Sequence, residues 1–337
     1  MLRTGLSLLM PYYNARERLP KTLGHLQNLR LEGMLPAEII FVDNNSDDES
    51  TNFIRETWSS PIEPVFITES RPGVSWARRT GLKACRFDTI GFVDQDNWVD
   101  PDWAEQGLAF MDSHPQAGGV GSLNRAAFDG QAPGWFERYQ GSYAIGPQRA
   151  IAANPVGLGV IWGAGCFLRK EAVDQALSLG VDPIISSRIG SGLLSGDETE
   201  IMMLMQLFGW RFYYEPAIKM THYISYHRLT WEYYKRFREG FGRTSVYIDM
   251  YRRLVAHYQL GVPLEKYDWK GEQSKARKAM LHDLPGLIST RLPGFEGNYR
   301  TSQALFRKGI WAERQEKGPK LAEVFESLQA TIADKLG

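Results

Sequence analysis

The chain has 337 residues with 39 basic and 39 acidic side chains, so its formal net charge is zero and no long-range positive field favours nucleic acid as a partner. Hydrophobic residues make up 43% and charged residues 23%, which is typical of a soluble globular protein. The two cysteines, Cys85 and Cys166, lie among apolar neighbours, and no apolar run reaches the roughly 18 residues of a membrane-spanning helix. These features predict a protein of a reducing compartment without a signal peptide or a spanning helix.

Strands and helices alternate in the first part of the chain. Apolar runs typical of buried strands occupy residues 5–10, 38–42, 65–68 and 89–93. Helical patterns lie between them, at 19–29, up to Trp58 and at 73–85. This alternation predicts βαβ units around a parallel sheet, so the polar residues after the four strands should line one crevice.

The second part of the chain has a less regular pattern. We expect a helix and a strand over about 101–123, loops over 130–165, a strand at 166–168, a helix at 170–179, a helix at 201–208 and strands at 210–214 and 218–222. Beyond Leu229 the pattern is helical. The Gly/Ser-rich stretch 190–196 predicts a mobile loop able to close over a substrate.

Two carboxylates one residue apart, Asp94 and Asp96, follow the apolar run 89–93. If that run is a buried strand, both acids lie at its carboxyl-terminal end, where ligands bind in open α/β sheets. Neighbouring carboxylates repel unless a cation lies between them, and Mg²⁺ and Mn²⁺ prefer oxygen ligands. The segment is consistent with a metal site and equally with an acidic turn that caps the next helix.

Two earlier segments are candidate nucleotide contacts. Asp43 ends the second strand and begins a turn that includes Asn45, whose polar groups can hydrogen-bond a base or a ribose, or cap the following helix. The positions of Asp48 and Ile54 argue against an EF-hand calcium loop. The glycine-led helix that follows carries Arg78 near its start, which is a natural anion site or else a solvent-facing basic turn.

Acidic residues recur where Asp197 and Glu198 open a helix. Acids in a first turn are stabilised by the helix dipole, and one of them can also be a general base held by a rigid helix end. His222 ends a strand-like run and is a candidate ligand for a divalent metal, although a lone histidine is more often a core or surface residue.

Taken in this order, the segments resemble the family 2 inverting glycosyltransferases of the GT-A fold over about residues 5–245. The matching stretches are SLLMPYYN, IIFVDNNSDDES, GVSWARRTGL, IGFVDQDNWVDPDW, GAGCFLRKEA and SGDETEIMMLMQLFGWRFYY. HYISYHRLTWEYYKR is similar to a bacterial polysaccharide-assembly subgroup. The chain departs from the family pattern at Arg79, where Asn is usual, and at the acid pair, where Asp precedes Glu. It also lacks the Q-x-x-R-W motif of processive synthases.

The resemblance implies a nucleoside-diphosphate sugar donor (UDP-sugar as the family-weighted choice), a glycan or lipid-linked acceptor, and Mn²⁺ or Mg²⁺ as cofactor. The nucleotide contacts it implies are Pro11, Tyr13, Asn14, Asp43, Asn45, Arg78 and Asp94. The metal ligands it implies are Asp96 and His222, and the acceptor contacts are Trp162 and Gly163. Glu198 takes the position of the catalytic base, with Asp197 as its competitor.

The expected fold is therefore α/β: a GT-A, Rossmann-like, mostly parallel sheet flanked by helices, with a helical C-terminal extension. We expect a catalytic domain over 1–225, divided into a nucleotide-sugar half at about 1–100 and an acceptor half at about 101–225, and the extension over 226–337. The aromatic and basic helix 231–243 either contacts an anionic membrane face or packs as an amphipathic helix. The expected location is cytoplasmic, with peripheral contact to the inner face of the cell membrane left open. Three alternatives are a nucleotidyltransferase acting on a sugar phosphate, a non-catalytic nucleotide- or glycan-binding module, and a retaining transferase of similar fold.

Overall fold

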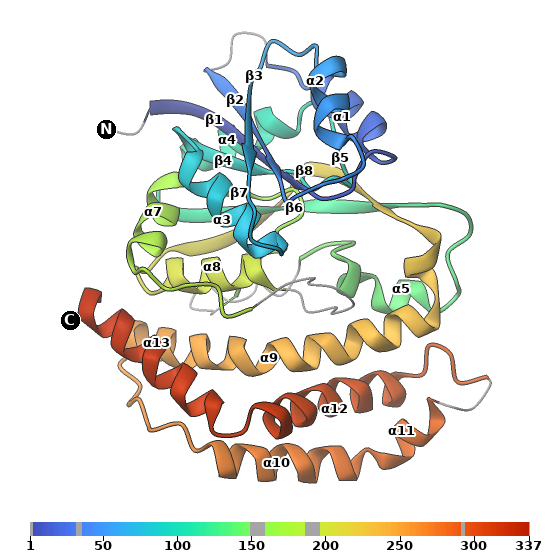
Figure 1. Cartoon of the computed structure of the whole chain (residues 1–337), viewed down its shortest axis with the longest axis vertical. Coiled ribbons are helices and arrows are strands. Elements are labelled where there is room, and N and C mark those ends of the chain that lie inside the picture. Colours follow the sequence, from blue (N-terminus) through green and yellow to red (C-terminus); the bar gives the residue numbers. More distant parts are fainter. Residues whose placement is uncertain (1–2, 32–35, 149–158, 186–195, 291–293, 337) are drawn as a thin grey trace.

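The computed structural model describes residues 3–31, 36–148, 159–185, 196–290 and 294–336. One sheet of eight strands, in the order β3-β2-β1-β4-β7-β6-β8-β5, forms its centre (Figure 1). The strands are β1 (Arg3–Tyr12), β2 (Ala37–Asp43), β3 (Glu63–Thr68), β4 (Phe87–Phe92), β5 (Asn97–Val99), β6 (Ala117–Phe128), β7 (Phe167–Arg169) and β8 (Arg211–Ile224). The helices within the chain up to β8 are α1 (Leu19–Gln27), α2 (Ser50–Thr57), α3 (Val74–Ala84), α4 (Trp103–Ser113), α5 (Phe136–Tyr139), η1 (Gln140–Tyr143), α7 (Lys170–Ser178) and α8 (Asp197–Gln206). The later helices are η2 (Tyr226–Leu229), α9 (Trp231–Leu260), α10 (Trp269–His282), α11 (Leu284–Ser289), α12 (Tyr299–Lys317) and α13 (Lys320–Leu336).

The first four strands have the arrangement predicted from the sequence. β1 is apolar on both faces, with Leu8 and Leu9 fully buried, and it pairs in parallel with β2 on one side and β4 on the other. β3 extends the sheet in parallel beyond β2. Their carboxyl ends therefore meet at one edge, as expected. Among the described strands four of the seven neighbouring pairs are parallel, since only β7 and β5 run against their neighbours.

The structure differs from the sequence prediction at β8 and β5. The two strands expected at 210–214 and 218–222 form one strand, because both pair with the continuous strand β6 and the register shifts between Glu215 and Lys219. Pro216 lies in that irregular segment, where its missing N–H costs no ladder hydrogen bond. β5 was not predicted; its three residues are too few for a periodic signal and pair antiparallel with β8.

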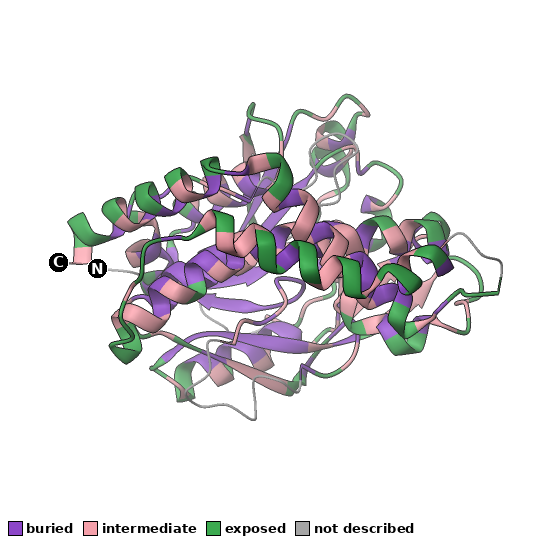
Figure 2. Ribbon diagram, turned by 90° about the horizontal axis from the view of Figure 1, so that it is seen from below, coloured by how far each residue is buried: buried purple, intermediate pink, exposed green. Residues whose placement is uncertain are grey.

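The C-terminal helices form a layer against the lower face of the sheet domain (Figures 1 and 2). One hydrophobic core includes strand residues such as Leu9, α8 residues such as Met202, and Tyr251 and Leu254 of α9. Phe325 of α13 belongs to the same core. The predicted domain boundary at residue 225 stays a prediction; it falls between β8 and η2, and the core extends across it.

Helices α9 and α12 cross with their backbones in close contact. A Cβ atom added at Gly242 would collide with the backbone oxygen of Phe306, and one added at Gly309 would collide with the backbone oxygen of Glu239. Glycine at both positions therefore sets how closely α12 lies against α9. None of the helices in the described ranges is both long and apolar enough to cross a membrane.

Candidate active site

A cavity of about 960 Å³ lies between the carboxyl ends of the first strands, the start of α8 and one face of α9. Its wall includes residues after β1, β2 and β4, and both halves of the sheet domain contribute to it. Of the predicted site residues, it contains Pro11, Tyr13, Asn45, Arg78, Asp94, Asp96, Trp162, Gly163, Asp197, Glu198 and His222.

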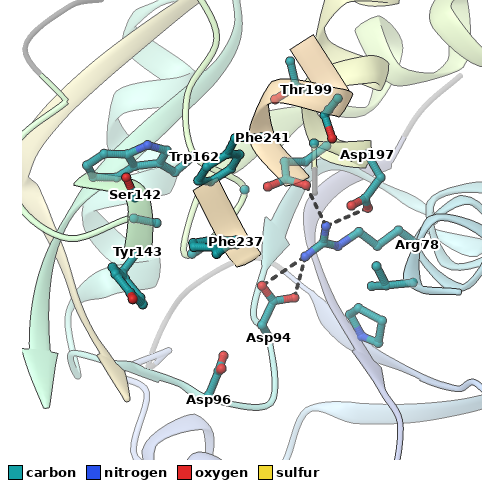
Figure 3. A pocket seen from close by; sticks show the side chains of 18 of the residues that line it. Arg78, Asp94, Asp96, Ser142, Tyr143, Trp162, Asp197, Thr199, Phe237 and Phe241 are labelled. Carbon is teal, nitrogen blue, oxygen red and sulfur yellow. Dashed lines mark hydrogen bonds and ion pairs between the residues drawn. The ribbon is translucent and has the colours of Figure 1, made fainter. Parts of the chain in front are cut away.

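Arg78 holds three carboxylates at the centre of this cavity (Figure 3). Its Nη1 donates to Asp197 at 2.7 Å and to Glu198 at 3.0 Å, and its Nη2 donates to the two oxygens of Asp94 at 2.8 and 3.0 Å. Helix α3 can place the guanidinium there because it lies close to the sheet: a Cβ added at Gly81 would collide with Leu9. The Asp94 carboxylate forms an ion pair with Arg78, and its predicted contact with the nucleotide stays a prediction.

The acid pair at the start of α8 is electrostatically asymmetric. Asp197 is the more buried, with 5% of its side chain exposed against 24% for Glu198. Burial and the neighbouring Asp197 charge raise the pKa of Glu198 to about 7, although Arg78 opposes the shift. A carboxylate with a pKa near neutrality can accept a proton from a hydroxyl and still be largely deprotonated at physiological pH.

Gly163 gives the Glu198 side chain its space. A Cβ atom added at Gly163 would lie 2.8 Å from Cγ and 3.0 Å from Cβ of Glu198. The residue predicted to contact an acceptor therefore packs directly against the candidate base.

Asp96 and His222 face each other across the turn after β4, with 3.5 Å between Oδ2 and Nε2. β5 and β8 bring them together, because Asn97 is paired with His222 in the sheet. The ring Nδ1 of His222 must donate to the carbonyl oxygen of Tyr143, 2.8 Å away, since a carbonyl can only accept. Nε2 is thereby directed at the carboxylate, the arrangement usual for a metal-binding histidine.

Arg228 is a third member of this group that the sequence did not single out. Its Nη1 lies 3.2 Å from Oδ2 of Asp96, and only 10% of its side chain is exposed. Within the described residues no group of three or more His, Cys, Asp or Glu side chains could hold a metal. An oxygen–nitrogen pair with room in the adjoining cavity fits Mn²⁺ or Mg²⁺ provided that a substrate and water supply the other ligands.

Two predicted nucleotide contacts hydrogen-bond within the turn after β2. Asp43 accepts hydrogen bonds from the backbone of Ser46 at 2.9 Å and from Oγ1 of Thr51 at 3.0 Å. Asn14 has a positive φ of 44° and accepts from the backbone of Asp47 at 3.0 Å. Both side chains shape the turn after β2, and neither is among the residues that line the cavity.

Aromatic side chains form the opposite side of the cavity (Figure 3). Trp162 and Tyr143 come from the segment between β6 and β7, and Phe237 and Phe241 come from α9. The spacing of the two phenylalanines predicts one apolar side of a helix, but that spacing does not indicate that this side borders the site.

The basic residues of the helix 231–243 are mostly engaged within the protein. Arg243 pairs with Glu313 and Glu316 of α12, and Lys235 pairs with Glu232. The aromatic residues Trp231, Tyr234 and Phe237 are buried, as in a packed amphipathic helix. The predicted mobile loop 190–196 lies outside the described residues except for Gly196.

Comparison with known proteins agrees with this geometry. Residues 7–177, about half of the chain, match the model of glycosyl transferase family 2. The chain is 31% identical over 104 residues to the putative glycosyltransferase EpsH of Bacillus subtilis, a match that covers 31% of this chain and 29% of EpsH. It is 26% identical over 112 residues to the amylovoran biosynthesis glycosyltransferase AmsE of Erwinia amylovora, covering 33% of this chain and 41% of AmsE. The matched stretches thus span less than half of either relative.

A solved structure extends the likeness to almost the whole chain. The mannosyltransferase PcManGT of Pyrobaculum calidifontis, solved with GDP-Man and Mn²⁺, superposes with a TM-score of 0.61 at 15% identity, covering 94% of this chain and 88% of PcManGT. The likeness confirms the predicted α/β GT-A fold. The protein belongs to glycosyl transferase family 2.

Proposed function

We propose that the protein transfers a sugar from a nucleoside-diphosphate sugar, with UDP-sugar as the first choice, to a hydroxyl of a glycan or lipid-linked acceptor in surface polysaccharide biosynthesis. The observation that carries the proposal is one cavity in which Arg78 with its acids, the Asp96–His222 pair and an aromatic wall face the same space. The family assignment and the polysaccharide-related name of AmsE support it.

In the proposed donor site, Pro11, Tyr13 and Asn45 bind the nucleoside, and Asp43 and Asn14 hold the turn that carries Asn45. Asp96 and His222 would hold the divalent metal. When bound, the metal supplies positive charge for the diphosphate leaving group. Arg78 orients the acids beside it, and Arg228 restrains the carboxylate of Asp96.

Glu198 is the proposed base, since it is more open to the cavity than Asp197 and is less tightly held by Arg78. It takes the proton of the acceptor hydroxyl as that oxygen attacks the anomeric carbon and the bond to the diphosphate breaks. A single displacement inverts the anomeric configuration. Trp162 and Phe241 offer apolar faces for the acceptor sugar.

The test is a panel of UDP-, GDP- and dTDP-sugars incubated with Mn²⁺, with Mg²⁺ or with EDTA, with release of nucleoside diphosphate as the readout. We expect release from a small set of donors and only with a divalent ion, together with a product of opposite anomeric configuration by NMR.

Asp96→Asn should remove most of this turnover while the fold is kept, because it removes a charged metal ligand. Asp102→Asn is the matched control, as Asp102 forms only a surface ion pair with Arg30 at 3.6 Å. Full turnover in EDTA, or in the Asp96 variant, would contradict the proposed metal dependence.

A further inference from the structure

Arg238 lies in the cavity wall without an acidic partner among the described residues. Its guanidinium carbon lies 4.4 Å from the ring centroid of Phe306, and its Nε is buried with no hydrogen-bond partner. Burial lowers the pKa of Arg238, and the neighbouring side chains that oppose this shift are the tyrosines Tyr234, Tyr139 and Tyr299, with no carboxylate among them. An aromatic ring stabilises the charge of an arginine less than a hydrogen-bonded carboxylate does.

Four other arginines line this cavity. Arg252 is exposed to solvent, and Arg18 donates to the backbone oxygen of Asn14 at 2.9 Å. Arg78 has three carboxylate partners and Arg228 has Asp96. Half-buried charges are normally paired, because an uncompensated one loses hydration without a replacement. The segments outside the described residues contain a single acidic side chain, Glu32. A ligand is therefore the natural source of the missing negative charge.

The position of Arg238 relates this charge to the proposed acceptor. Arg238, Phe241 and Thr244 share the cavity-facing side of α9. Thr244 of α9 packs against Gly196, the residue before α8, since a Cβ added at Gly196 would come within 3.1 Å of Cγ2 of Thr244. Six residues separate Arg238 from Thr244, which is about 9 Å along a helix. An anion on Arg238 would thus lie within a short glycan's reach of the hydroxyl that Glu198 deprotonates.

We propose that Arg238 binds an oxyanion carried by the acceptor, either a phosphate ester or the carboxylate of an acidic sugar. The class of acceptor is then an anionic glycan instead of a neutral one. This inference rests on the proposed function in taking the cavity as the site of sugar transfer, but the binding it asserts needs neither donor nor metal.

The test measures binding of three ring-matched probes, glucose, glucose 1-phosphate and glucuronic acid, to the full chain in EDTA by ligand-detected NMR. We expect at least one anionic probe to bind about ten- to a hundredfold more tightly than glucose, as is typical for hydrogen bonds to charged groups. The stronger of the two anionic probes identifies phosphate or carboxylate as the preferred group.

Arg238→Gln should remove this advantage and Arg238→Lys should restore part of it. Arg236→Gln, two residues away on the exposed side of α9, removes the same charge and should keep the advantage. An advantage that persists in Arg238→Gln assigns the anion to another cation, and equal binding of all three probes by the unaltered protein denies the anion site; either result overturns the inference.

Transfer assays separate this inference from the proposed function. If no nucleotide sugar is turned over but the Arg238-dependent binding is found, the proposed function fails and the anion site stands. If turnover is found but phosphorylated or acidic acceptors give no higher kcat/KM than neutral ones, the inference fails and the proposed function stands.

Discussion

Arg78 joins carboxylates from two distant parts of the chain, Asp94 after β4 and the acid pair at the start of α8. Its charge stabilises three acids that would otherwise repel one another in a largely enclosed space. Burial and the charge of Asp197 raise the Glu198 pKa, and the charge of Arg78 lowers it. Substitution of Asp197 or Arg78 should therefore change the pH dependence of the reaction.

For Glu198 we expect kcat/KM to rise with pH through about 7, because a base acts only when deprotonated and its pKa is raised. Glu198→Gln should lower turnover by about 10²- to 10⁴-fold. Asp197→Asn should move the rising limb to lower pH, since it removes a charge that raises the Glu198 pKa. Measured profiles in which Asp197→Asn moves the limb upward would exclude Glu198 as the base.

Gly163→Ala should lower turnover by at least tenfold while the melting temperature stays within a few degrees, because the three atoms nearest to the added methyl group all belong to the Glu198 side chain, which it would displace. Gly141→Ala is the matched control in the same cavity, where the nearest atom to an added Cβ is 3.9 Å away on Trp162. Equal activity of the two variants would show that the Glu198 position is not critical.

Sequence reasoning identified most of these side chains, because each follows a strand or begins a helix with a recognisable pattern. It could not assign Asp94 to Arg78 or Arg228 to Asp96, since 16 and 132 residues separate the partners and their pairing depends on the sheet order. For the same reason it could not show that Asp43 and Asn14 hydrogen-bond within the turn after β2. Their contact with the nucleotide stays a prediction.

Among the secondary-structure elements, the crossing of α9 and α12 fixes one wall of the cavity. Phe306 of α12 reaches the cavity, and the backbone contact at Gly242 and Gly309 determines how far it extends. Gly309→Ala would force the helices apart, since an added Cβ meets the backbone oxygen of Glu239 and not a flexible side chain.

We expect Gly309→Ala to lower the free energy of unfolding by about 1–3 kcal/mol, the usual cost of overpacking. In contrast, Gly24→Ala in α1 has no atom within 4 Å of the added Cβ and should be neutral or stabilising by up to about 1 kcal/mol. Urea denaturation of both variants gives the comparison. Equal effects would mean that helix propensity, and not the crossing, controls the outcome at Gly309.

The order and type of the first elements followed from local patterns: apolar runs for β1, β2 and β4 and amphipathic spacing for the helices between them. β5 and the continuous β8 did not, because both owe their existence to pairing with partners far along the chain. The role of α9 could not be predicted from the sequence either, because apolar residues recur with the same spacing on a helix face that borders a cavity and on one that borders a core.

On the scale of the whole molecule, a buried carboxyl group of α8 joins the segment after α7 to α9 of the C-terminal helices. Oε1 of Glu200 accepts from the backbone of Ile184 at 2.9 Å and from the hydroxyl of Tyr251 in α9 at 2.5 Å. Burial raises the pKa of Glu200 to about 7 from its ordinary value of 4.5. The folded state therefore holds this proton over a pH range in which the unfolded chain has lost it.

Stability should consequently fall as pH rises from about 4.5 to about 7, because the native state binds more protons than the unfolded state in that window. The contribution of Glu200 is about 3 kcal/mol at most. Glu200→Gln, which can still accept both hydrogen bonds, should be more stable than the unaltered protein at pH 8 and similar at pH 5. Thermal melts across pH 5–8 give the comparison, with Glu323→Gln at an exposed position as the control. The same pH dependence of the melting temperature in Glu200→Gln and Glu323→Gln would refute this prediction.

Helix α9 presents one side to the cavity and another to the core it shares with α8 and α13. Substitutions on its two sides are therefore coupled in evolution. A shift of the helix that alters the cavity also alters its packing against the core. A hybrid that joins the first 225 residues of this chain to the C-terminal helices of a family member should therefore fold stably only if the apolar residues of α8 are also taken from that family member.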